Sequence, residues 1–173
     1  RRHTRLQGDW SSDVCSSDLM MLTGGSPTMH PKIVNELTHL ANERDIFITI
    51  ETEGSHFLAT DYPINLLSIS PKFSNSVPVL GVETPQGAIT DQKMIDRHNK
   101  FRVNKDAIKK SIDYHLDYHI KPVLDKDLSM VKEVEEFLKD LEIPDNKVWA
   151  MPAGDDREAL FESYGPVMNF VRD

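Results

Sequence analysis

The sequence predicts an α/β fold built on parallel strands. Along residues 20–173, short apolar runs typical of buried strands alternate with amphipathic stretches of helical period. This alternation favours parallel strands joined by right-handed crossovers, as in an open sheet or part of a barrel. The length of this region suits one domain with a single hydrophobic core.

The first half of the region contains three expected strands and one expected helix. The strands are MMLT (20–23), IFITI (46–50) and NLLSIS (65–70), the last of which stops at Pro71. The helix begins near Pro31, and its inward face is formed by Ile33, Val34, Leu37, Leu40 and Ala41. Residues 73–92 are rich in Gly and Pro and are expected to form a long loop, which is more often functional or disordered than structural.

The second half continues the alternation. Helical period returns at 106–115 and 129–141, and apolar strand-like runs occupy 119–124 and 148–151. Ser129 is the expected N-cap of the second helix, and Phe137 and Trp149 are expected in the core. A last helix follows PAGDD, and Gly165-Pro166 is expected to interrupt it.

Composition and charge exclude several classes of protein. The net charge is −8 and there is no basic stripe, so the chain is a poor candidate for binding a nucleic-acid backbone, and a small-molecule ligand is favoured. No apolar run approaches the roughly 20 residues needed to cross a bilayer. Residues 20–173 contain no cysteine, which fits a cytoplasmic location.

The first nineteen residues differ from the rest. They have no helical or strand period, are crowded with Ser and Asp, and hold the only cysteine, Cys15. Residues 9–19 can be encoded by the constant part of a widely used sequencing-library adapter, and residues 1–5 by its outer part. We expect residues 1–19 to be translated reagent without ordered structure, the alternative being a natural disordered tail.

Four of the expected strands lead into small, polar or Gly- and Pro-rich turns. These are LTGGSP (22–27), ETEGS (51–55), SISPK (68–72) and MPAGDD (151–156). Ligands of parallel α/β folds bind beyond the carboxyl ends of the strands, so these turns are expected to form one pocket. The alternative is structural, because strand-to-helix turns commonly contain Gly and Pro in any case.

Together, the motifs TGGSP, ETEG, SPK and MPAG, in this order and spacing, resemble the 7-carboxy-7-deazaguanine synthase family. The resemblance covers residues 20–173. It implies a partial barrel of parallel strands of the radical S-adenosylmethionine type. It also implies a lyase of queuosine (7-deazapurine) biosynthesis that converts 6-carboxy-5,6,7,8-tetrahydropterin to 7-carboxy-7-deazaguanine and releases ammonia. It implies a homodimer as well, which is the usual state in the family.

The resemblance also implies roles for individual residues. Thr23 and Glu51 match positions that contact the pterin substrate. The positions implied for S-adenosylmethionine are Gly24, Gly25, Ser26, Ser70, Pro71, Lys72, Met151, Pro152, Ala153 and Gly154.

Two departures from the family pattern matter. The family often has Glu where this chain has Ser26, and a neutral hydroxyl contacts the cofactor ammonium more weakly. The three-cysteine loop that binds a four-iron, four-sulfur ([4Fe–4S]) cluster, the neighbouring Mg²⁺ ligand and an N-terminal strand should lie before Met20, and the last substrate contacts should lie after the final helix. We therefore expect a chain truncated at both ends and catalytically inactive, since Cys15 alone cannot bind a cluster.

Other interpretations remain open. The parent protein could be another radical S-adenosylmethionine enzyme, such as a glycyl-radical activating enzyme, or a non-enzymatic α/β domain that binds a small molecule. His115 and His119 are spaced as metal ligands on a helix, but the predicted turn between them disfavours such a site. His56 is expected to be an exposed loop residue.

Overall fold

A computed structural model of the chain describes residues 18–84 and 87–172. Four parallel strands form the main sheet in the order β1-β2-β3-β6. They are β1 (Leu19–Leu22), β2 (Phe47–Thr52), β3 (Leu66–Ile69) and β6 (Tyr118–Ile120). Residues 1–17 of the expected adapter-derived tail lie outside the described residues.

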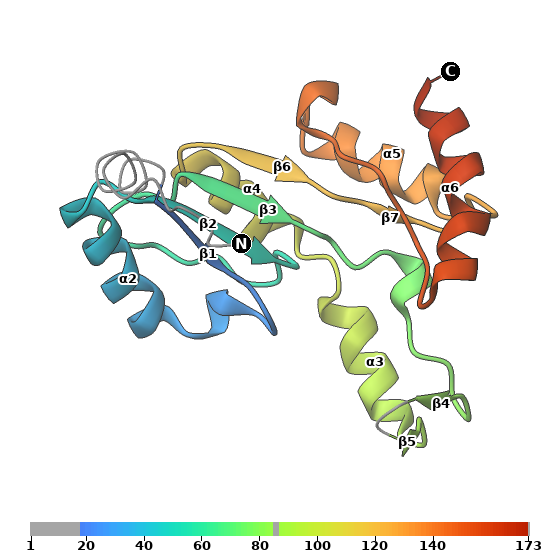
Figure 1. The fold of residues 1–173 in the computed structure, drawn as a ribbon. Helices are drawn as coiled ribbons and strands as arrows, with labels where there is room; N and C mark the ends of the chain where they lie inside the picture. The colour runs from blue at the N-terminus through green and yellow to red at the C-terminus, as the bar shows by residue number, and fades with distance from the viewer. Residues whose placement is uncertain (1–17, 85–86, 173) are drawn as a thin grey trace, which may run out of the picture.

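A second pair of parallel strands extends this sheet. Pro122 separates β6 from β7 (Val123–Leu124), which pairs with β8 (Met151–Pro152). A parallel bridge between Ile120 and Val148 links the two sheets, so all six strands run in the same direction (Figure 1). The expected α/β fold with parallel strands is confirmed.

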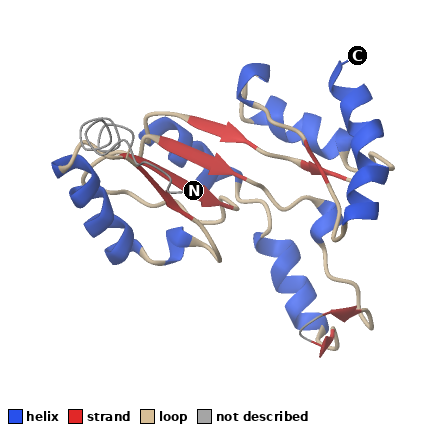
Figure 2. Cartoon of the chain, in the orientation of Figure 1, coloured by secondary structure: helices blue, strands red, loops and turns tan. Residues whose placement is uncertain are grey.

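Helices connect most of the strands, as Figure 2 shows. They are α2 (Pro31–Glu43), α3 (Gln92–Phe101), α4 (Lys105–Tyr114), α5 (Val131–Asp140) and α6 (Arg157–Arg172). A two-stranded antiparallel hairpin, β4 (Glu83–Thr84) and β5 (Gly87–Ala88), precedes α3, and both extend away from the sheet (Figure 1). Three short 3₁₀ turns occupy Pro27–Met29, Ser74–Ser76 and Asp145–Lys147.

The two faces of the main sheet differ in polarity. One face buries Ile48, Ile50, Leu67, Ile69 and Ile120, which belong to the hydrophobic core. The alternating positions carry Thr49, Glu51, Ser68 and His119, and the register aligns Glu51, Ser68 and His119 in one row. Because side chains alternate along a strand, the apolar core and the polar row lie on opposite faces of the sheet.

The core also contains residues from the helices. Phe73 and Phe137 are both 1% exposed and pack edge to face at 5.4 Å between ring centroids, which confirms the expected core position of Phe137. Trp149 was expected in the core, but it is 62% exposed. Its place on the polar face of the sheet explains the difference, since it lies beside His119 with ring centroids 5.5 Å apart.

Three details of the helices differ from expectation. Ile33 is exposed, because α2 buries the neighbouring Val34 together with Thr38 and Ala41. Ser129 does not cap α5, since its hydroxyl donates to Asp125 instead. Helix α6 continues through Pro166, and the preceding Gly165 lacks the Cβ that would clash with the proline ring.

Two boundaries were also misplaced. The described residues of 73–92 include the Ser74–Ser76 turn, the paired strands β4 and β5 and the start of α3, so this segment is more structured than the sequence predicted. Strand β1 begins at Leu19, and the Phe47 amide donates to the Asp18 carbonyl. The regular structure therefore begins one residue before Met20.

Candidate functional site

A cavity of about 420 Å³ lies at the carboxyl ends of β1, β2 and β3. The strands are parallel, so their carboxyl ends meet at one edge of the sheet, as the sequence predicted. The cavity is lined by Thr23, Gly24, Gly25, Ser26, Glu51, Thr52, Glu53, Ser70 and Lys72. Three of the four strand-end motifs therefore meet in one place.

The glycine pair leaves the backbone open to a ligand. Gly24 and Gly25 have φ angles of 85° and 60°, a conformation that residues with a Cβ rarely adopt. A Cβ placed on either would meet nothing within 4 Å, so the free space lies beside the main chain rather than being filled by protein. Backbone N–H and C=O groups in this turn can therefore approach a ligand closely.

Glu51 is held in place by two neighbours. Its carboxylate accepts hydrogen bonds from Thr23 Oγ1 at 2.8 Å and from Lys121 Nζ at 2.8 Å, the latter being an ion pair. The Lys121 hydrogen bond is the main reason that the pKa of Glu51 lies below its usual value, and Thr23 adds to it. Glu51 is thus a fixed, ionised acceptor at the edge of the cavity.

Glu53 provides a second carboxylate that sequence reasoning missed. Its Oε1 accepts from Ser26 Oγ at 2.8 Å and also from the Ser55 hydroxyl. Burial raises the pKa of Glu53, but hydrogen bonds from Ser55, its own backbone amide and Ser26 lower it by more, so the net shift is downward. The ETEG motif could have indicated Glu53, because its two acids are separated by one threonine, but the resemblance implied a role only for Glu51.

The polar row of the sheet continues from Glu51 to β6. His119 Nε2 lies 2.9 Å from Ser68 Oγ. Lys121, two residues further along the chain, donates a hydrogen bond from Nζ to Glu51. Burial and the positive charge of Lys121 lower the pKa of His119, which favours a neutral imidazole. Neither His119 nor Lys121 was assigned to the site from sequence, because their strand partners are about fifty and seventy residues away.

The fourth motif, residues 151–154, lies at the end of β8. Since β8 is parallel to β7 and linked to β6, this end lies on the same edge of the extended sheet as Gly25 and Ser70. Met151, Pro152, Ala153 and Gly154 are not among the residues that line the cavity, and neither is Pro71. A Cβ on Gly154 would lie 2.4 Å from the Leu160 amide nitrogen, so this glycine is needed for close packing of α6.

A second cavity of about 420 Å³ adjoins the first and shares Glu53 and Lys72 with it. Residues of α3 line its other side, among them Arg97 and His98. His56 is an exposed loop residue, as expected, and it also lines this cavity. The two cavities form one cleft between the strand ends and α3.

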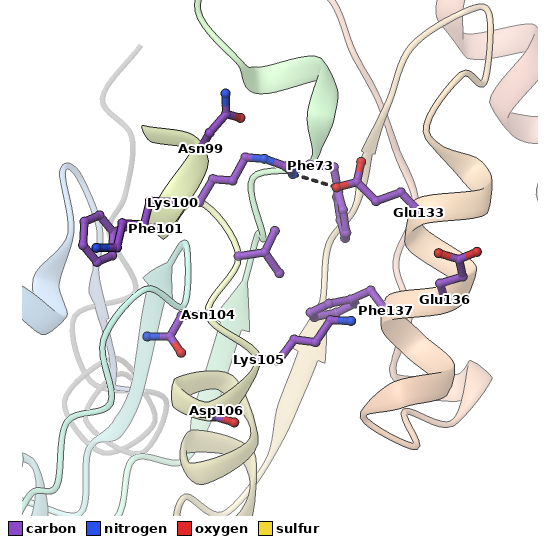
Figure 3. A pocket seen from close by; sticks show the side chains of 12 residues that line it. Phe73, Asn99, Lys100, Phe101, Asn104, Lys105, Asp106, Glu133, Glu136 and Phe137 are labelled. Carbon is purple, nitrogen blue, oxygen red and sulfur yellow. Dashed lines mark hydrogen bonds and ion pairs between the residues drawn. The ribbon is translucent and has the colours of Figure 1, made fainter. Parts of the chain in front are cut away.

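A larger cavity, of about 620 Å³, lies elsewhere, between the α3–α4 connection and α5 (Figure 3). Within it Arg102 Nη1 donates to Glu133 Oε1 at 2.6 Å and to the Lys72 carbonyl at 3.1 Å. Glu133 also accepts from the Ser74 amide at 2.9 Å. These contacts fix the backbone after β3, and with it the position of Lys72.

The possible metal pair is not formed. His115 ends α4 and is buried, where Nδ1 accepts from the Ile64 amide and Nε2 donates to the Leu58 carbonyl, both at 3.1 Å. His119 lies on β6. Across residues 18–84 and 87–172, no three His, Cys, Asp or Glu side chains are grouped to hold a metal ion.

None of the helices in these ranges has the length and apolarity required to span a bilayer.

The fold and the cavity define a parallel α/β protein with a cavity at the carboxyl ends of its strands. A crystal structure of a domain of pyruvate-formate lyase-activating enzyme from Bacteroides vulgatus is similar in fold, with a TM-score of 0.50. The match covers 89% of this chain and 95% of that one, at 14% sequence identity. This likeness confirms the predicted fold, an α/β arrangement of parallel strands.

Two curated proteins that are similar to this chain in sequence share one name. The chain is 33% identical over 144 residues to 7-carboxy-7-deazaguanine synthase of Halobacterium salinarum, covering 80% of this chain and 52% of that protein. It is 28% identical over 141 residues to 7-carboxy-7-deazaguanine synthase of Rhodopirellula baltica, covering 82% and 50%. No family model matches the sequence. The resemblance stated from the motifs is confirmed, and the chain spans about half the length of these relatives.

Proposed function

We propose that the chain forms the cofactor- and substrate-binding part of a radical S-adenosylmethionine enzyme, and that the whole protein is a 7-carboxy-7-deazaguanine synthase. The observation that carries the proposal is the cavity where the motifs of residues 23–26, 51–53 and 70–72 meet. The sequence similarity to two synthases supports the particular reaction. That reaction converts 6-carboxy-5,6,7,8-tetrahydropterin to 7-carboxy-7-deazaguanine with release of ammonia.

The residues of the cavity suit S-adenosylmethionine. The open backbone of Gly24 and Gly25 can approach the ligand, and Ser70 and Lys72 supply hydrogen-bond donors opposite them. Residues 151–154, at the same edge of the sheet, would contact the adenosyl part. When bound, the cofactor supplies the radical chemistry that gives this class of enzymes its name.

Glu51 is the proposed acceptor for the pterin. An ionised carboxylate accepts hydrogen bonds from the amino and ring N–H groups of such a heterocycle. Lys121 and Thr23 hold it at the strand end, and Lys121 keeps it charged. Lys121 and Thr23 are thus positioning residues that act on the substrate through Glu51. Thr23 also lines the cavity itself.

The residues of this chain do not fit the iron–sulfur cluster. The sequence has a single cysteine, whereas a cluster of this kind is held by several thiolates. These residues therefore cannot supply a reaction step that depends on the cluster, and we propose that the chain by itself is inactive. The Mg²⁺ ion and the homodimer stay predictions from the resemblance, and the cytoplasmic location stays a prediction from the composition.

The proposal is tested with the protein from the complete reading frame that contains residues 20–173. After anaerobic reconstitution with iron and sulfide, it should convert the carboxytetrahydropterin to 7-carboxy-7-deazaguanine, detected by mass spectrometry. A loaded enzyme that cleaves S-adenosylmethionine without forming this product would favour another radical enzyme, such as a glycyl-radical activating enzyme. A protein that neither binds a cluster nor cleaves the cofactor would favour a small-molecule-binding domain.

A further inference from the structure

The cavity holds one carboxylate that is neutralised and one that is not. Glu51 is paired with Lys121 at 2.8 Å. Glu53 forms no ion pair with a lysine or arginine anywhere in residues 18–84 and 87–172. The hydroxyls of Ser26 and Ser55 donate to it and hold the carboxylate without cancelling its charge.

An unpaired cation borders the same cavity. Lys72 is exposed and makes no ion pair in the described ranges, although its carbonyl is fixed by Arg102. Glu53 and Lys72 both line this cavity and the adjoining one. A half-buried charge without a partner is unfavourable, and a ligand with the opposite charge would relieve that cost. An unpaired acid and an unpaired base on one cavity match a ligand that carries both an ammonium and an anionic group.

We propose that Glu53 binds the ammonium group of an α-amino-acid moiety and that Lys72 receives its carboxylate. On the proposed function, on which this inference rests, that moiety is the methionine part of S-adenosylmethionine. The carboxylate that binds the ammonium group is then supplied by the loop after β2. It is not supplied by the turn after β1, where the chain has Ser26. Ser26 contributes by donating its hydroxyl hydrogen to Glu53 Oε1, which holds the carboxylate beside the residue that follows the glycine pair.

The test compares two ligands that differ only in the amino-acid part. S-adenosylhomocysteine carries the ammonium and carboxylate, and 5′-methylthioadenosine lacks both. Isothermal titration calorimetry of the 173-residue chain should give tighter binding of the first compound. Glu53→Gln keeps an acceptor for Ser26 but removes the charge, so it should weaken S-adenosylhomocysteine by roughly 10- to 100-fold, as expected for loss of a charge-assisted hydrogen bond. Binding of 5′-methylthioadenosine should not change.

Three further variants complete the design. Ser26→Glu combined with Glu53→Gln returns a carboxylate to the turn after β1 and should restore most of the lost affinity. Lys72→Met should weaken only the compound with the carboxylate, which tests the site even if a Glu53 variant fails to fold. Glu36→Gln removes an exposed acid on α2 and should leave both affinities unchanged.

The outcomes separate the inference from the proposed function. Glu53→Gln and Lys72→Met chains that are folded by circular dichroism and still prefer S-adenosylhomocysteine to the wild-type extent would overturn the inference alone. In that case the adenosine part would still be bound, and the proposed cofactor would stand. A wild-type chain that binds neither compound would contradict the proposed cofactor and the inference together.

Discussion

Lys121 Nζ lies 2.8 Å from Glu51 Oε1, so a residue just after β6 fixes the charge of a residue near the end of β2. Strand β3 lies between these two strands in the sheet. The pair therefore joins three strands across the polar face, at the mouth of the cavity. Because Glu51 is the proposed substrate acceptor, this pair is the first feature to test.

Replacing Lys121 with Met should raise the pKa of Glu51 toward its usual value, because the Lys121 hydrogen bond is the largest cause of the downward shift. Carbon-detected NMR titration of the glutamate carboxyl groups measures this directly. Lys109→Met is the matched control, since Lys109 pairs with Asp113 on the surface of α4 and should leave the Glu51 titration unchanged. An unaltered Glu51 titration in Lys121→Met would contradict the assigned contact.

The same pair has a small effect on stability. The folded-state pKa of Glu51 lies below its unfolded value, so its stabilisation is present above the unfolded value and is lost as pH falls through the folded value. Because the Glu51 side chain is 38% exposed, solvent screening keeps the contribution below about 1 kcal/mol. Urea unfolding of wild type and Lys121→Met should therefore converge as the pH falls into the acid range.

Gly54→Ala should be strongly destabilising. Gly54 has a φ of 78°, and an added Cβ would lie 2.6 Å from Ile108 Cγ1 and 3.0 Å from Ile69 Cγ2, both buried side chains. Gly81→Ala is the control, because Gly81 has a φ of 82° but nothing within 4 Å of the added Cβ. Both variants place a Cβ on backbone with a positive φ, whereas only Gly54→Ala overpacks the core, so its free energy of unfolding should fall by roughly 1–3 kcal/mol more. Equal losses in urea denaturation would refute the packing.

His115 should make the fold sensitive to mild acid. Burial lowers the pKa of His115 and outweighs its hydrogen bond to the Leu58 carbonyl, so the folded state keeps a neutral imidazole while the unfolded state protonates near 6.5. The stabilisation is present above that value and is lost as pH falls below it. Unfolding free energies measured on either side of about pH 6.5 should differ less in His115→Gln than in wild type.

Some pH dependence should survive in that variant. The pKa values of His98 and His119 are lowered as well, first by burial and then by nearby positive charge, and both act in the same direction. A His115→Gln chain with an unchanged dependence would mean that His115 is not buried as a neutral acceptor and donor.

Reconstitution of the 173-residue chain with iron and sulfide should give no stoichiometric cluster. One cysteine cannot supply the several thiolates that such a cluster needs, and Cys15→Ser should bind the same residual iron as wild type. Iron and sulfide analysis with visible absorption spectroscopy measures the outcome. A full cluster, lost on mutation of Cys15, would refute the expectation that residues 1–19 are not part of the natural protein.

Much of the fold could be predicted because its strands are short, apolar and separated by helices with one apolar face. Helix α3 escaped prediction since it buries only Ile95, which leaves no apolar stripe in the sequence. Trp149 was predicted in the core because large aromatic side chains are usually buried. In the structure Val148 pairs with Ile120 on the apolar face, so the next residue, Trp149, lies on the polar face and is exposed.

The site was predicted in part. Thr23, Gly25, Ser26, Glu51, Ser70 and Lys72 were expected together, and they line one cavity. Lys121 and His119 could not be found from sequence, because their contacts depend on which strands are neighbours and on the register between them. Glu53 could have been found from ETEG, but its role depends on the bond to Ser26, which only the folded chain reveals.

The most direct measurement is a crystal structure of the 173-residue chain with S-adenosylhomocysteine. We predict ligand density in the cavity between Gly25, Ser26, Glu53, Ser70 and Lys72, with the adenine toward residues 151–154. Density instead in the larger cavity between the α3–α4 connection and α5, or none in crystals grown at saturating ligand, would contradict the proposal that the strand-end motifs form the cofactor site.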